Sequence, residues 1–99
     1  MYKIKGDFWC HNNNLTSLNG CPNIVEGYFD CDYNNLTSLE GAPEIIEADF
    51  DCRDNNLTSL KGCPKIVKGS FFCNGQKNGH KFTVEEVKIH CKVGGHIYV

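Results

Sequence analysis

The chain has 99 residues, of which 40% are hydrophobic and 22% are charged, and a chain of this length forms one domain that buries about two-thirds of its unfolded surface. Its net charge of −2 is too small to indicate a nucleic acid or a membrane surface as a partner. No apolar run approaches the ~20 residues that cross a bilayer. The opening residues MYKIKGDFWC lack the apolar centre of a secretion signal, so we expect a cytoplasmic protein.

One string recurs along the chain with a spacing of 21 residues: FWCHNNNLTSL, FDCDYNNLTSL and FDCRDNNLTSL begin at Phe8, Phe29 and Phe50. A strict repeat of this length indicates a stacked architecture, because one unit cannot bury its apolar residues alone. We divide the single domain into repeats 4–24, 25–45 and 46–66, a partial repeat 67–82 and a C-terminal cap 83–99.

Each repeat contains the same sequence of short elements. The F-x-C segment has the alternation of a strand, with Phe and Cys on one side. A pair of Asn residues then turns the chain. A Gly followed two residues later by Pro marks a second bend. Stacked F-x-C strands predict a parallel sheet with neighbouring strands about 4.8 Å apart. The column of Asn13, Asn34 and Asn55, continued by Gln76, can bond backbone groups at the turn of each repeat.

These residues resemble the leucine-rich repeat, L-x-x-L-x-L-x-x-N-x-L. In repeat 25–45, Phe29 and Cys31 occupy the two strand leucines, Asn34 the turn asparagine and Leu36 the leucine that follows. The resemblance is nearest to the short bacterial and viral repeats that carry cysteine in the second strand position. It implies a right-handed coil, and the replacement of the first leucine by phenylalanine should alter the curvature of the coil and leave the fold unchanged.

The C-terminal segment KFTVEEVKIHCKVGGHIYV departs from the repeat. Thr83 and Glu86 form a capping box that predicts a helix over 84–92, ended by Gly94-Gly95, and HIYV reads as a final short strand or a strap. A solenoid needs its last strand covered, so we expect an α+β repeat solenoid with a parallel β-sheet and a C-terminal helical cap. The elements F-T-x-E-E-V and I-Y-V resemble the C-terminal segments of small repeat proteins from tailed phages.

The 7 cysteines follow the repeat, which argues against a disulfide framework. The first column contains Cys10, Cys31, Cys52 and Cys73. The second contains Cys21 and Cys63, with Ala42 at the equivalent position of the middle repeat, and Cys91 lies outside both columns. We expect reduced, buried thiols that act as small apolar residues. A column ~14 Å long cannot place four thiols around one zinc ion.

The sequence also predicts no metal site, no cofactor and no enzymatic activity. His80, His90, Cys91 and His96 lie in an irregular segment but lack the spacing of zinc ligands. Adjacent Cys and His residues, such as Cys10 and His11, point to opposite faces of a strand, and burial makes a thiol unreactive. The chain contains no Gly-rich phosphate loop and no nucleophile elbow.

Acidic and aromatic residues gather at the strand positions that should face the solvent. Asp30 and Asp51 would place like charges on neighbouring strands, which costs stability, and exposed aromatic residues are typical of protein interfaces. On the opposite side of the coil the sequence instead aligns Glu40, Glu44 and Glu47 with Lys61, Lys65 and Lys68. The candidate partner-binding residues are Trp9, Tyr28, Asp30, Asp32, Asp49, Asp51, Arg53 and Phe72.

The sequence therefore favours a non-catalytic protein–protein interaction module that binds a partner with a basic patch through this face. If the source is a phage, the expected partner is a bacterial host protein in the host cytoplasm, which the module would block. Two alternatives stay open: a structural protein that self-associates into homo-oligomers, and an acidic DNA mimic that inhibits a nucleic-acid enzyme. A Ca²⁺ site on the aspartates is a further alternative, and neither a membrane nor nucleic acid is an expected partner.

Overall fold

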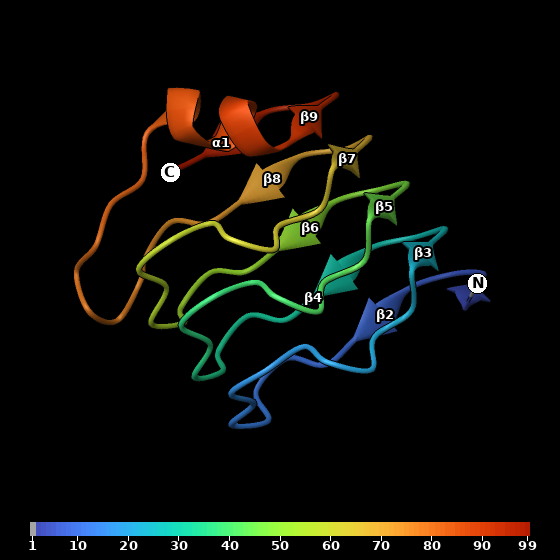
Figure 1. The fold of residues 1–99 in the computed structure, drawn as a ribbon, viewed down its shortest axis with the longest axis horizontal. Helices are drawn as coiled ribbons and strands as arrows, with labels where there is room; N and C mark the ends of the chain where they lie inside the picture. Colours follow the sequence, from blue (N-terminus) through green and yellow to red (C-terminus); the bar gives the residue numbers. More distant parts are fainter. Residues whose placement is uncertain (1) are drawn as a thin grey trace.

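The computed structural model describes residues 2–99, which form a β-solenoid of about three turns with repeats of ~21 residues (Figure 1). Two parallel sheets run along the stack, and the two chain ends lie toward its opposite ends. The first sheet contains β1 (Lys3–Ile4), β3 (Ile24–Val25), β5 (Ile45–Ile46), β7 (Ile66–Val67) and β9 (Lys92–Val93). The second contains β2 (Phe8–Trp9), β4 (Phe29–Asp30), β6 (Phe50–Asp51), β8 (Phe71–Phe72) and β10 (Ile97–Tyr98).

The repeats stack in register, as the spacing predicts. Each strand of the second sheet pairs with its equivalent one repeat later, so that Phe8, Phe29, Phe50 and Phe71 form one column. The strands are only two residues long because bends follow them closely. At one of these bends Gly41 adopts φ +93°, and a Cβ there would lie 2.5 Å from the carbonyl carbon of Leu18, so glycine is required.

The Phe and Cys columns form the core, which confirms the predicted inward orientation. Phe29, Phe50 and Phe71 are fully buried, and their ring centroids lie 5.8 Å and 5.1 Å apart along the column. Cys31 and Cys52 are also fully buried. A buried aromatic side chain contributes roughly 1.5–3 kcal/mol relative to exposure, so the Phe column is a main source of stability for a molecule this small.

The first sheet, built from the Ile-Val pairs, was missed by the sequence analysis, which predicted a single sheet. Val25, Ile46 and Val67 are fully buried and face the Phe column from the other side of the coil. Two-residue strands are too short for the periodicity that identifies a strand. The usable signal was the β-branched pair after each Pro, because branched residues favour extended backbone.

The asparagine column is confirmed as a ladder that bonds one repeat to the next. The Oδ1 atom of Asn34 accepts hydrogen bonds from the backbone N–H groups of Asn13 and Leu15, both at 2.9 Å, and its Nδ2 donates to the Cys10 and Cys31 carbonyl oxygens at 3.0 Å. Gln76 takes the same place in the partial repeat, donating to the Cys52 and Cys73 carbonyls. The ladder satisfies backbone groups that would otherwise be buried without partners.

The C-terminal segment starts as predicted and ends differently. Helix α1 (Val84–His90) begins after the capping box of Thr83 and Glu86, but it ends two residues before the predicted end at 92, because Lys92–Val93 pairs with β7. Gly94-Gly95 was predicted to end the helix and instead bends the chain between β9 and β10. A Cβ on Gly94 would collide with the Lys68 carbonyl oxygen.

Residues 92–98 therefore add one strand to each sheet, and α1 packs against both of these strands. The predicted final strand is confirmed as β10, which pairs with β8. Within residues 2–99, no helix has both the length and the apolar character needed to cross a membrane.

Candidate functional site

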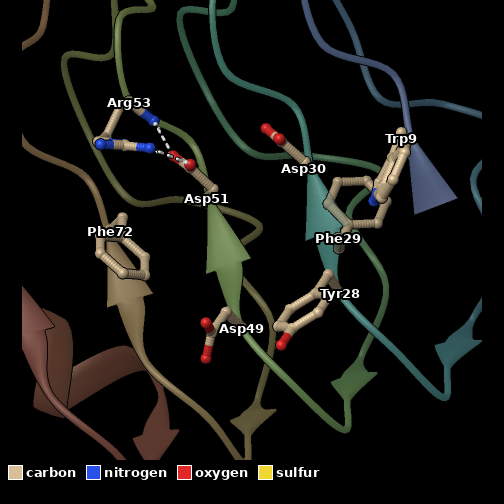
Figure 2. Close-up of a pocket in the computed structure, with 8 residues that line it drawn as sticks. All are labelled: Trp9, Tyr28, Phe29, Asp30, Asp49, Asp51, Arg53 and Phe72. Atoms are coloured by element: carbon tan, nitrogen blue, oxygen red, sulfur yellow. Dashed lines mark hydrogen bonds and ion pairs between the residues drawn. The ribbon is translucent and has the colours of Figure 1, made fainter. Parts of the chain in front are cut away.

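The outward face of the second sheet contains a hollow of about 320 Å³ (Figure 2). It is lined by Trp9, Tyr28, Phe29, Asp30, Asp49, Asp51, Arg53 and Phe72. Seven of these are residues that the sequence analysis named as a candidate site, and the eighth, Phe29, is a fully buried core residue. The remaining candidate, Asp32, does not line the hollow and lies beside Asp30.

Strand register places the central residues of the hollow in one row. Trp9 pairs with Asp30, Asp30 with Asp51 and Asp51 with Phe72, so two carboxylates lie between two aromatic side chains. Figure 2 shows the Asp30 and Asp51 carboxylates on the same face of the sheet. The predicted row of like charges is therefore present, with an aromatic residue at each end.

Arg53 neutralises one of the two carboxylates. Its Nε donates to Asp51 Oδ1 at 2.9 Å and its Nη2 donates to Asp51 Oδ2 at 2.7 Å. The hydrogen bond to the Asp51 carboxylate raises the pKa of the Arg53 guanidinium above its usual value. The guanidinium carbon also lies 5.2 Å from the centroid of the Phe72 ring, within the range of a cation–π interaction. This pairing relieves much of the repulsion expected between Asp30 and Asp51.

In the described part of the chain, residues 2–99, no guanidinium pairs with Asp30, which instead lies beside Asp32 and His11. The Asp32 backbone N–H donates to Asp30 Oδ1 at 3.1 Å, and His11 Nδ1 lies 3.8 Å from Asp30 Oδ2. Partial burial, and then the hydrogen bond and the charge of Asp30, raise the pKa of Asp32 to about 6. Two carboxyl groups therefore lie close together beside one imidazole.

The same three residues are the candidate metal ligands of this structure. Among residues 2–99, only His11, Asp30 and Asp32 form a group of three His, Cys, Asp or Glu side chains whose ligand atoms lie within 4.8 Å of one another. The His80, His90, Cys91 and His96 set considered from the sequence does not form such a group. An imidazole nitrogen and carboxylate oxygens suit a divalent cation such as Zn²⁺ or Mn²⁺.

Asp49 has a structural role that sequence reasoning missed. Its Oδ1 accepts a hydrogen bond from the Ser70 backbone N–H at 2.8 Å, and Asp7 accepts one from the Tyr28 N–H at 2.8 Å in the same way. These two bonds join one repeat to the next at the bends before β4 and β8. The signal was an aspartate one position before the strand Phe, at Asp7 and Asp49, two repeats apart.

Aromatic side chains flank the acids on both sides. Trp9 is 67% exposed and Tyr28 is 49% exposed, whereas the Phe72 ring is stacked on Tyr98 with centroids 4.6 Å apart. Tyr98 belongs to β10 and was not among the predicted site residues. It continues the row because β10 pairs with β8, a placement that depends on the C-terminal segment returning to the stack.

The cysteines are free thiols and, apart from Cys91, have raised pKa values. Burial raises the pKa of Cys10 to about 12 and raises that of Cys31 well above the usual value. A hydrogen bond with Cys63 lowers the pKa of Cys91, but the Cys91 side chain is itself buried. Buried neutral thiols make poor nucleophiles.

The chain was also compared with known proteins. No protein-family model, no curated protein and no solved structure gives a significant match.

Proposed function

We propose that this chain is a non-catalytic protein-binding module whose acidic–aromatic face docks on a partner that carries a basic patch. The observation that carries the proposal is the hollow on the second sheet, to which four successive repeats contribute seven of the predicted residues. Three carboxylates and one guanidinium line it, so its charge is net negative. Exposed Trp and Tyr side chains are typical of binding hot spots, and the negative charge around them favours a basic partner.

The scaffold supports this function because it presents the face without rearrangement. In-register pairing and the buried asparagine ladder fix the backbone beneath Asp30 and Asp51, and a preformed face loses little conformational entropy when a partner binds. The other side of the coil differs in its electrostatics. There Lys61 lies 3.3 Å from Glu40 and Lys68 lies 3.1 Å from Glu47, so opposite charges compensate one another.

We further propose that the solenoid is a right-handed coil of the leucine-rich-repeat type and that α1 acts as its C-terminal cap. The N-N-L-T-S-L strings support the first part. The packing of α1 against β9 and β10, with Val87 fully buried, supports the second. The resemblance of the C-terminal segment to phage proteins supports a bacterial host protein as the partner, bound and blocked in the host cytoplasm.

One observation favours the second candidate function, self-association. A hollow of about 260 Å³ at the first repeat is lined by Phe8, Cys10, Leu15, Leu18 and other residues. Phe8 and Leu15 are only half-buried there, whereas their equivalents Phe29 and Leu36 are fully buried. A second copy covering this end would bury apolar surface. Light scattering over a concentration series tests the idea, and strict monomers at the highest concentration would exclude it.

We do not propose the DNA-mimic function. A mimic of a phosphate backbone needs a continuous row of negative charge, and Arg53 neutralises Asp51 in the middle of the row. The exposed aromatic side chains around the row, Trp9, Tyr28 and Tyr98, also fit protein recognition better than phosphate mimicry.

The proposed function is tested by reversing the charge of the face. We expect the double variant Asp30→Lys, Asp51→Lys to keep the far-ultraviolet circular dichroism of the wild type and to lose the partner that wild-type protein captures. The matched control is Glu40→Lys, Glu44→Lys, which changes the net charge by the same amount on the other side of the coil and should capture the partner normally. Undiminished capture by the Asp variant would show that the partner binds a different surface.

A further inference from the structure

The hollow already contains one arginine side chain, that of Arg53. Its guanidinium makes two hydrogen bonds to the Asp51 carboxylate and lies over the Phe72 ring. A planar guanidinium can satisfy both contacts at once, since its edge donates to a carboxylate while its face stacks on an aromatic ring. The chain itself therefore displays one complete arginine site, made of an acid and an aromatic residue on neighbouring strands.

The other half of the hollow has the same acid and an aromatic neighbour but lacks the arginine. Asp30 pairs in register with Asp51 on one side and with Trp9 on the other. In the repeat of Asp30, the position equivalent to Arg53 is occupied by Asp32, 21 residues earlier. This repeat therefore has a negative charge where the next repeat has a positive charge. The half-site of Asp30 and Trp9 thus mirrors that of Asp51 and Phe72, with the cation missing.

Within residues 2–99, no lysine or arginine side chain forms an ion pair with Asp30. His11 lies near it, but the 3.8 Å between His11 Nδ1 and Asp30 Oδ2 is too long for a hydrogen bond. The Trp9 side chain is 67% exposed, so the half-site is accessible. The pKa of Asp32 is raised first by partial burial and then by the hydrogen bond and the negative charge of Asp30, and the latter effect agrees with an excess of negative charge at this place.

We infer that the half-site formed by Asp30 and Trp9 binds one arginine side chain of a protein partner, with its guanidinium paired to the Asp30 carboxylate and stacked on the Trp9 indole. The inference rests on the proposed function and specifies which residue of the basic partner enters the hollow. Arginine fits better than lysine because an ammonium is a compact point charge that cannot pair and stack in one plane. The bound side chain completes the row as Trp9, arginine, Asp30, Asp51, Arg53 and Phe72.

A divalent cation held by His11, Asp30 and Asp32 is the main competing occupant. It would use the same carboxylate but would not involve Trp9, and the cluster is partly exposed. The arginine assignment accounts for both the acid and the aromatic residue, and it has an occupied counterpart one repeat away. The experiment below separates the two occupants.

The test uses the full chain and a small probe. Trp9 is the only tryptophan of the chain, so its fluorescence reports on this half-site. The Asp32 backbone N–H, which donates to Asp30 Oδ1, reports on the carboxylate through its amide chemical shift. The probe is N-acetyl-arginine amide, compared with the lysine equivalent and with the neutral citrulline equivalent, in buffer that contains EDTA.

We expect a saturable change in both signals with the arginine probe, in the millimolar range, a weaker one with lysine and none with citrulline. Asp30→Asn should weaken binding about 10-fold or more, because it removes a charge-assisted pair. Glu44→Gln, which removes one exposed carboxylate elsewhere, should leave binding unchanged. Asp32→Arg should abolish binding, since it supplies the missing guanidinium from within the chain.

Three results would overturn the inference: no saturable change at Trp9, equal binding of arginine and lysine, or a response of the Asp32 amide to Zn²⁺ or Mn²⁺ while the arginine probe gives none. The probe does not require the partner, so the two proposals fail separately. Loss of partner capture by the Asp30 and Asp51 double variant, together with no arginine binding, would contradict this inference alone. Arginine binding with undiminished capture would support the inference for the half-site and contradict the proposed partner surface.

Discussion

Replacing Asn55 by alanine should strongly destabilise the solenoid, because Asn55 is a buried member of the asparagine ladder. The Asn55 side chain is fully buried and makes four hydrogen bonds. Its Oδ1 accepts from the Leu36 N–H at 3.0 Å, and its Nδ2 donates to the Cys31, Cys52 and Arg53 carbonyl oxygens at 3.1–3.2 Å. Alanine removes all four and restores none.

The expected loss of stability follows from the buried backbone groups that Asn55→Ala leaves without a side-chain partner. The Leu36 N–H becomes a buried donor without its side-chain partner, which costs roughly 1–3 kcal/mol. The carbonyl oxygens lose a partner each, at a smaller cost because each has two lone pairs, and the volume of the lost amide adds about 1 kcal/mol as a cavity. We therefore expect Asn55→Ala to lower the free energy of unfolding by about 3–5 kcal/mol.

Asn13→Ala is the matched control, because Asn13 occupies the same column at the exposed first repeat. Its side chain makes one hydrogen bond, from Nδ2 to the Cys10 carbonyl oxygen at 3.1 Å, so its loss should cost less than about 1 kcal/mol. Urea unfolding followed by circular dichroism gives both values, with the slope of the transition as a check that the same surface is exposed. If Asn55→Ala costs no more than Asn13→Ala, the ladder is not a stabilising element and the reasoning fails.

Three further predictions concern charge, core and thiols. Folding raises the pKa of Asp32 from 3.8 to about 6, so the contribution of Asp32 to stability is present below pH 4 and is lost as the pH rises through 6. The substitution Asp32→Asn should therefore raise the melting temperature at pH 7.5, by an amount that corresponds to at most about 1 kcal/mol after solvent screening. At pH 3.5 it should leave the melting temperature unchanged. Leu36→Ala should cost roughly 2–5 kcal/mol in urea unfolding through a core cavity, and a cost below about 1 kcal/mol would contradict the packing described. Cys31 and Cys52 should react with Ellman's reagent only after unfolding, and fast labelling of either thiol in native protein would contradict their burial.

The repeat itself could be predicted because its period is a property of the chain. A spacing of 21 residues places Phe8, Phe29, Phe50 and Phe71 in one column in any in-register stack, and period-2 alternation then sends Cys31 to the same side as Phe29. The capping box was equally accessible, since Thr83 and Glu86 are three residues apart and their mutual hydrogen bonds need no tertiary partner. These features depend on local geometry or on strict repetition, and both are written in the sequence.

The first sheet and the C-terminal return depended on tertiary structure. Two residues such as Ile45–Ile46 carry no periodicity, so their pairing arises only when neighbouring repeats stack. The last connection is longer: Ser70 and His96 are 26 positions apart, compared with 21 in the regular repeats. Because the inserted helix changes this spacing, a search at the fixed repeat length does not align Ile97 with Phe71. Sequence alone therefore predicted a final strand at HIYV without its pairing to β8, missed β9, and left Tyr98 out of the site.

Sequence by itself determined which residues share the outward face, because alternation along each strand and stacking in register leave Asp30 and Asp51 no other place. Only the tertiary structure decided how their charges are used. A side chain as long as arginine can reach several acids, and its choice of Asp51 follows from the distance and angle at which the strand holds both groups, together with the Phe72 ring beneath. Asp30 has no guanidinium beside it because the position equivalent to Arg53 in its own repeat is occupied by Asp32. A second carboxylate cannot neutralise the first.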